Sequence, residues 1–284
     1  MLGFYQPFAS WTHLLAALIT LSTGFMLLRK GWGNKLRVAS LVVFMICFLF
    51  MFSMSGIYHA LEPGFGRQVF RRLDYAAIYT MIAGTATPIH IIFFRGWRRW
   101  GVLLFLWFVA IVGLLLTIIL IDNMPEWLTL TIFISMGWSA IISMIHAWKL
   151  YGFQRISLAL YGGVAYTVGA FIDFMRIDGP FPGITGHHEI FHLFVVLGAA
   201  MHWKLIYNWA QQPTHKKLIF MVREKSEFEL IARAVGENIR ISATSRQDLR
   251  RRVKEYIDLR FHPCLVPRKV RFRYYKDIMM DLHQ

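Results

Sequence analysis

Seven long apolar blocks dominate this chain and set what it can fold into. A helix needs about 20 mostly apolar residues to cross a hydrocarbon core roughly 30 Å thick. Lipid offers no partner to backbone N–H and C=O groups, and the blocks are too long and too uniformly apolar for barrel strands. We therefore predict an all-α bundle of seven transmembrane helices. The blocks cover residues 11–28, 38–60, 74–94, 101–121, 125–148, 156–174 and 188–209.

Composition supports a membrane domain followed by a soluble one. Hydrophobic residues make up 56% of the 284 residues and charged residues 17%, whereas soluble domains carry about 25% charged residues. Residues 211–284 depart from this pattern, with 17 Lys/Arg and 9 Asp/Glu. We therefore assign residues 1–210 to a membrane domain and residues 211–284 to a basic soluble domain. The N-terminal stretch lacks a basic region and a cleavage pattern, so we expect the first block to be a retained span.

The tail has the pattern of a small α+β domain. Two alternating runs around "EKSE" predict a hairpin, and "NIRISA" and "KVRFRYY" predict a third and a fourth strand. Between them, "TSRQDLRRRVKEYIDLRF" predicts a helix with Thr244 or Ser245 as its N-cap. The order β-β-β-α-β resembles that of HicB-like antitoxin domains. The apolar face of the helix would be formed by Leu249, Val253, Tyr256, Ile257 and Leu259.

Basic residues are divided unevenly between the two sides of the predicted bundle. An excess of Lys/Arg in short loops marks the cytoplasmic side. The side opposite the N-terminus carries Arg29, Lys30, Lys35, Arg37, Arg95, Arg98, Arg99, Lys149, Arg155, Lys204, Lys216 and Lys217. The N-terminal side carries only Arg67, Arg71, Arg72 and Arg176. We predict that the N-terminus lies outside and the C-terminus in the cytoplasm.

Three polar groups at membrane depth stand out, because ionisable side chains inside spans are costly and usually functional. Ser55 and His59 end the second block, Asp74 opens the third, and His188 and His192 open the seventh. Side chains four residues apart share a helix face, and two histidines so placed can hold one metal ion. Counting crossings brings all three groups to one side of the membrane. These residues alone fit a metal site and a hydrogen-bonded polar network equally well.

The other polar residues at membrane depth are isolated along the sequence. We expect His13, His90, His146 and His202 to be packing or interfacial residues rather than metal ligands. We expect Asp173 to be a solvated acid at the end of the sixth span.

The motifs "SMSGIYHAL", "LDYAAIYTMIAGTATP" and "HEIFHLFVVLGAAMHW", in this order, resemble the hemolysin III branch of the PAQR family. That family includes the adiponectin and progestin receptors. The resemblance covers residues 8–210 and implies a zinc ion held by His59, His188 and His192. It also implies that Asp74 helps to deprotonate a zinc-bound water, with Ser55 as its polar neighbour. The receptor members are thought to place the N-terminus in the cytoplasm, which opposes the charge distribution of this chain.

The resemblance extends to membrane hydrolases such as alkaline ceramidases, and so implies hydrolysis of a lipid amide or ester. Two alternatives stay open: a receptor or regulator of membrane homeostasis, and a hemolysin-like pore. The expected location is the bacterial inner (plasma) membrane. The expected partners are a membrane lipid, as acyl-chain substrate or ligand, and the anionic leaflet, rather than nucleic acid, for the basic tail. Whether the chain forms a homo-oligomer stays open.

Overall fold

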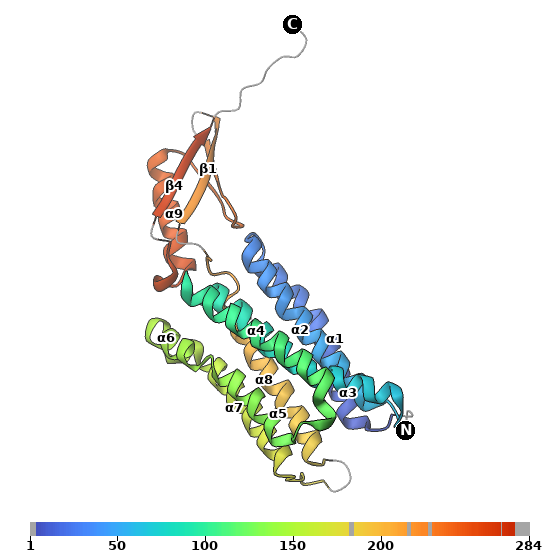
Figure 1. Ribbon diagram of the computed structural model, residues 1–284. Coiled ribbons are helices and arrows are strands. Elements are labelled where there is room, and N and C mark those ends of the chain that lie inside the picture. The colour runs from blue at the N-terminus through green and yellow to red at the C-terminus, as the bar shows by residue number, and fades with distance from the viewer. Residues whose placement is uncertain (1–3, 182–184, 215–216, 227–228, 268, 276–284) are drawn as a thin grey trace.

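A computed structural model describes residues 4–181, 185–214, 217–226, 229–267 and 269–275. Within these residues, seven helical segments are long and apolar enough to cross a membrane. They run along a common direction, and the tail domain lies beyond the end opposite the N-terminus (Figure 1). The first four spans are α1 (Pro7–Gly31), α2 (Lys35–Ala60), α3 (Phe65–Phe93) and α4 (Trp97–Leu120), which a short 3-10 turn (Ile121–Asn123) extends. The fifth consists of α5 (Glu126–Trp138) and α6 (Ile141–Tyr151), followed by α7 (Phe153–Phe174) and α8 (His187–Trp209).

Two spans differ from the sequence prediction. Helix α3 begins at Phe65 rather than at residue 74, so Asp74 lies inside the helix and does not open it. Arginines of the added turns donate hydrogen bonds to carbonyl groups at the ends of neighbouring helices, Arg67 to Leu61 O at 2.5 Å and Arg72 to Ile118 O at 2.6 Å. The fifth span is interrupted after Trp138, where the Ser139 hydroxyl donates to Met136 O over 2.6 Å and competes with the helical hydrogen bonds.

Helix α3 is the most deeply buried span, and the α5–α6 segment is the least buried. Close helix contacts around α2 and α3 depend on glycines. A Cβ added at Gly84 would lie 2.6 Å from Cys47 Cβ, and one added at Gly56 would lie 2.7 Å from Leu14 Cγ. Small residues at such crossings let helix backbones approach closely in a membrane. This packing brings the end of α2 beside α3, and α8 beside α1 and α7.

The tail has the predicted β-β-β-α-β order. Strands β1 (Lys217–Ser226), β2 (Glu229–Ala234), β3 (Arg240–Ala243) and β4 (Lys269–Tyr275) form a sheet in the order β3-β2-β1-β4. Strands β1 and β4 pair in parallel, and the other pairs are antiparallel. The hairpin turn includes residues 227–228, which lie outside the described residues, as do residues 276–284 of the predicted domain.

Helix α9 (Arg246–Arg260) covers one face of this sheet, and the side chains between helix and sheet form the hydrophobic core of the tail domain. Ser245 is the N-cap and accepts a hydrogen bond from Asp248 N. Leu249, Val253 and Ile257 are buried against the strands, as predicted. Leu259, which the sequence analysis placed on the apolar face, is 86% exposed. Its position falls on the solvent side of a regular helix that Val253 and Ile257 already anchor to the sheet.

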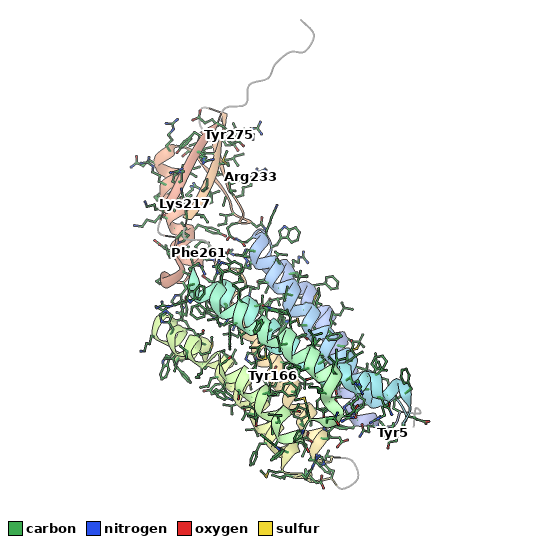
Figure 2. The ribbon with its side chains drawn as sticks, viewed as in Figure 1. Tyr5, Tyr166, Lys217, Arg233, Phe261 and Tyr275 are labelled. Atoms are coloured by element: carbon green, nitrogen blue, oxygen red, sulfur yellow. The ribbon has the colours of Figure 1, made fainter. Side chains whose placement is uncertain are left out.

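The tail is attached to the bundle through buried polar contacts. Arg37 donates to Gly31 O and to Gln212 O, and its guanidinium lies 2.9 Å from the Glu237 carboxylate. Asn34 Nδ2 donates to the same carboxylate over 3.0 Å. Figure 2 shows Phe261 at the bundle end of the tail and Tyr275 at its far end.

Candidate metal centre

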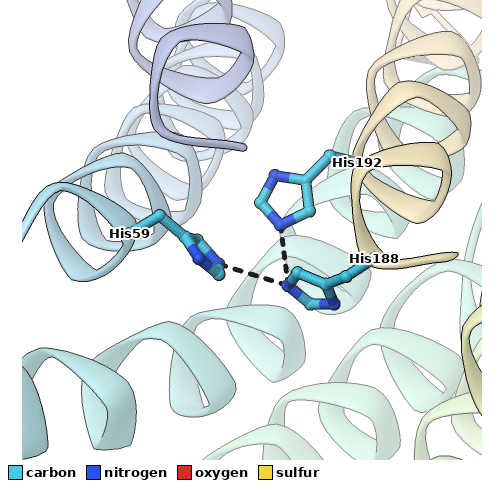
Figure 3. A group of neighbouring side chains, drawn as sticks. All are labelled: His59, His188 and His192. Atoms are coloured by element: carbon cyan, nitrogen blue, oxygen red, sulfur yellow. Dashed lines mark hydrogen bonds between the residues drawn. The ribbon is translucent and has the colours of Figure 1, made fainter. Parts of the chain in front are cut away.

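Three histidine rings converge where α2 ends and α8 begins (Figure 3). His59 comes from the last turn of α2, and His188 and His192 come from the first turns of α8. His188 Nε2 lies 3.3 Å from His59 Nε2 and 3.1 Å from His192 Nε2. One nitrogen of each ring lies within 4.8 Å of the others. The structure thus brings together the three histidines that the sequence singled out.

The hydrogen-bond partners determine which ring nitrogens carry protons. His59 Nδ1 lies 2.5 Å from Gln6 Oε1, an oxygen that also accepts from Arg67, so this nitrogen is a donor. His188 Nδ1 lies 3.2 Å from a carboxylate oxygen of Asp173 and is a donor as well. A neutral imidazole that donates from Nδ1 presents a lone pair at Nε2. Two such lone pairs therefore face each other over 3.3 Å, which is an arrangement that a cation between them would stabilise.

This donor set fits a zinc ion. Zinc is commonly held by histidine nitrogens, and three of them leave a position for water or substrate. Metal-binding histidines usually donate their second N–H to a carboxylate or carbonyl oxygen. His59 and His188 both do so, through Gln6 and Asp173.

Asp173, expected from the sequence to be a solvated helix-end acid, lies instead beside the histidine cluster. It lies at the end of α7, with Oδ1 2.7 Å from His187 Nδ1 and 3.2 Å from His188 Nδ1. Its side chain is only 20% exposed. The sequence position of Asp173, at the end of a predicted span, does not predict this contact, because the contact arises only from the packing of α7 against α8.

Asp74 and Ser55 lie on neighbouring helices, α3 and α2. Ser55 is 2% exposed. Both residues line the same cavity as His192. The last turns of α2, the interior of α3 and the first turns of α8 therefore bring the predicted polar groups together.

His13 is a neighbour of the cluster that the sequence analysis treated as isolated. Its ring stacks on that of His192 with centroids 3.9 Å apart. Within the described residues, neither of its ring nitrogens has a hydrogen-bond partner. His90 and His202 lie deeper in the bundle and bond to backbone carbonyls of their own helices, Ala86 O and Gly198 O.

A cavity of about 230 Å³ extends from the histidine cluster into the bundle. Ser55, Asp74 and His192 lie at one part of its wall, and His90 and His202 lie at another. Between them the lining is mainly aliphatic and aromatic, formed by Met51, Ile78, Ile82, Ile89, Phe133, Ile134, Met144, Leu160 and Val195. An apolar cavity with polar groups at one place is the general form of a ligand site.

A protein-family model described as "Haemolysin-III related" matches residues 6–203. The chain belongs to the haemolysin-III related family. It is 31% identical to Hemolysin-3 of Bacillus cereus over 192 residues, which is 67% of this chain and 84% of the relative. It is 26% identical to the Hemolysin-3 homolog of Bacillus subtilis (strain 168) over 71% of this chain and 93% of the relative.

The haemolysin-III related family connects this chain to plant heptahelical proteins of the PAQR family. The chain is 29% identical over 202 residues to the heptahelical transmembrane protein ADIPOR2 of Oryza sativa subsp. japonica, covering 64% of this chain and 87% of the relative. The family match includes the first six spans, the seventh as far as Trp203, and the histidine cluster, and it ends before β1. This protein is therefore a multi-pass membrane protein of that family with a further domain at its C-terminal end.

Proposed function

We propose that this protein binds zinc through His59, His188 and His192 and hydrolyses a membrane lipid amide or ester. The observation that carries the proposal is the meeting of two histidine lone pairs at 3.3 Å, beside an acid and next to His192, which lines an apolar cavity. A zinc ion held there would supply a Lewis acid that lowers the pKa of a bound water to about 7 and polarises a carbonyl.

The protein's own side chains supply the remaining functions. Asp74 accepts a proton from the attacking water and returns it to the leaving amine or alcohol as the C–N or C–O bond breaks. Ser55, which lines the same cavity, orients Asp74 by donating its hydroxyl to the carboxylate. Asp173 and Gln6 fix the orientation of the His188 and His59 rings. The apolar cavity holds an acyl chain and excludes bulk water.

Metal analysis of purified protein tests the first half of the proposal. We expect about one zinc per chain in the wild type and far less in His188→Ala, because two nitrogens cannot hold the ion as tightly as three. His90→Ala is the control, because His90 is a buried histidine that lines the same cavity as His192 but lies outside the cluster. Equal zinc content in all three proteins would refute the metal site.

Release of fatty acid from supplied N-acyl lipids and lipid esters tests the second half. We expect Asp74→Asn to keep its zinc and to lose activity by roughly 10²–10⁴-fold, the usual contribution of a general acid–base. A zinc-loaded wild type that binds such lipids without releasing fatty acid would instead favour the receptor or regulator function. The name ADIPOR2 of the plant relative is consistent with that alternative.

We further propose that the protein lies in a bacterial inner membrane with its N-terminus outside and its tail in the cytoplasm. The cluster of arginines and lysines at the tail end of the bundle supports this orientation. A reporter enzyme that is active only in the periplasm, fused either before Met1 or after Gln284, tests this orientation. We expect activity from the N-terminal fusion and none from the C-terminal fusion.

A further inference from the structure

The face of the tail sheet opposite α9 is strongly basic. Alternation along the strands buries Leu218, Phe220 and Val222 of β1 under α9 and turns the intervening residues outward. Among the described residues, no element covers this outer face. Seven exposed basic residues have the strand parity that places them on it: Lys217, Arg223, Arg233, Arg240, Lys269, Arg271 and Arg273.

The strand register arranges these residues in a dense array. Arg273 of β4 pairs with Met221 of β1, Met221 pairs with Arg233 of β2, and Arg233 pairs with Arg240 of β3. Neighbouring strands lie about 4.8 Å apart, and residues two apart along a strand, such as Arg271 and Arg273, lie about 7 Å apart. Like charges directly opposite each other destabilise a sheet. The repulsion between these arginines therefore destabilises the sheet, and an anionic ligand bound to the row would offset that repulsion.

Four arginines of this array are not neutralised by the protein within the described residues. Arg233, Arg240, Arg271 and Arg273 have no carboxylate partner there. The acid on the same face, Glu229, is already paired with Lys225 over 3.0 Å.

The basic residues of α9 have the opposite arrangement. Arg251 and Arg252 bind Asp248, and Arg251 also binds Glu255. Two of the central arginines of α9 are therefore paired within the helix, whereas Arg233, Arg240, Arg271 and Arg273 of the sheet have no such partner among the described residues.

The orientation of the sheet bears on what covers the outer face. In Figure 2, Lys217 lies toward the bundle and Tyr275 at the far end, so the strands lead away from the membrane domain. The outer face then stands along the bundle direction instead of lying flat on a leaflet. Electrostatic attraction to a leaflet falls off within a Debye length, about 8 Å at physiological salt. A second copy of the same face would be repelled by its like charge.

We propose that the outer sheet face binds a single-stranded nucleic acid. Guanidinium groups match phosphate oxygens in geometry and charge. Between the arginines lie the half-buried side chains of Ile219, Met221 and Ile231, and Tyr275 is 41% exposed at the far end. Single-strand sites combine a basic surface with flat apolar and aromatic side chains on which bases lie. The proposal replaces the expected partner, the anionic leaflet, with a soluble polyanion.

Fluorescence anisotropy with the full chain in phosphatidylcholine nanodiscs tests this proposal. The probe is a fluorescein-labelled 20-nucleotide oligouridylate, titrated at several salt concentrations. We expect binding whose log K falls linearly with log salt, with a slope of about −0.7 per phosphate contacted. Arg271→Glu with Arg273→Glu should weaken binding by at least about tenfold and make the slope shallower. Arg233→Glu with Arg240→Glu should do the same from the other side of the sheet.

The matched control is Arg250→Glu with Lys254→Glu, which makes the same charge change on exposed positions of α9. Near-wild-type binding by this control supports the sheet face. Equal losses in the control and the sheet variants would show a nonspecific effect of net charge and overturn the proposal. It would also be overturned by equal affinity for a duplex of the same length, or by sheet variants that keep the oligonucleotide and lose only phosphatidylglycerol vesicles.

Discussion

At the scale of single residues, the candidate metal centre is defined by what lies behind the histidines. Gln6 and Asp173 each accept from a Nδ1–H and thereby leave a Nε2 lone pair pointing into the cluster. Asp173 also holds His187, which cannot join the cluster from its own position on the helix. The role of His187 is thus to share the carboxylate that orients His188.

Removing the Asp173 carboxylate should weaken metal binding without removing a ligand. We expect Asp173→Ala to lower zinc affinity by about 10–100-fold, the usual effect of losing such a partner of a metal-bound histidine. Competition with a chromogenic zinc chelator measures it. His187→Ala is the control, because it removes the other partner of Asp173 and leaves His188 bonded. An equal loss in both variants would point to a general disturbance of the α7–α8 end.

At the scale of helices and strands, close packing depends on single glycines. Gly162 and Gly163 are neighbours on α7 with opposite surroundings. A Cβ at Gly162 would lie 2.5 Å from His202 Cε1, whereas a Cβ at Gly163 would meet nothing within 4 Å. The first position is part of the α7–α8 contact, and the second opens onto the cavity.

This pair gives a matched test of helix packing. Gly162→Ala should destabilise the bundle by about 1–3 kcal/mol, the usual cost of overpacking, since His202 must shift. Gly163→Ala should keep or raise stability, because alanine is favoured over glycine within a helix. Thermal unfolding in detergent measures both. A lower midpoint for Gly163→Ala than for Gly162→Ala would contradict this account of the contact.

The start of α9 should show a defined dependence on pH. Hydrogen bonds from Arg251 and from Thr244 N, with the Arg252 charge, lower the pKa of Asp248 to about 2. A carboxylate whose pKa is lowered on folding stabilises the fold above its unfolded pKa of about 3.9. That contribution is lost as the pH falls from about 4 toward about 2.

Asp248→Asn should therefore have a less stable tail than wild type at pH 7, with faster amide exchange, and the difference should shrink toward pH 2. The tail contains no tryptophan, so its stability is followed by hydrogen exchange of its backbone amides, compared between the two proteins at each pH. A difference that stays constant over this range would show that Asp248 acts through packing and not through its charge.

At the scale of the whole molecule, a buried ion pair joins the tail to the bundle. Burial raises the pKa of Glu237, while Arg37 and Asn34 favour its charged form. The side chains of Arg37 and Glu237 are 3% and 5% exposed. Removing one partner of such a pair leaves the other charged group buried and unpaired, which lowers the stability of the fold by about 3–5 kcal/mol.

Arg37→Met should loosen the attachment of the tail. We expect faster hydrogen exchange in residues 32–34 and 235–239, because the guanidinium no longer bridges Glu237 and the carbonyls of Gly31 and Gln212. The exposed Arg71–Asp122 pair provides the control, and Arg71→Met should leave this exchange unchanged. Unchanged exchange in Arg37→Met would mean that the apolar contacts alone hold the tail in place.

The sequence by itself determined the seven spans, the tail order and the three histidines, because hydrophobic length, strand alternation and i, i+4 spacing are local properties of a chain. Counting crossings was enough to bring Ser55, His59, Asp74, His188 and His192 to one membrane face. Only the tertiary structure decided that Asp173 and His13 join this cluster and that Arg233, Arg240, Arg271 and Arg273 share one face of the tail sheet. Those facts depend on contacts between elements distant in sequence, and no local pattern records which neighbour a side chain will meet.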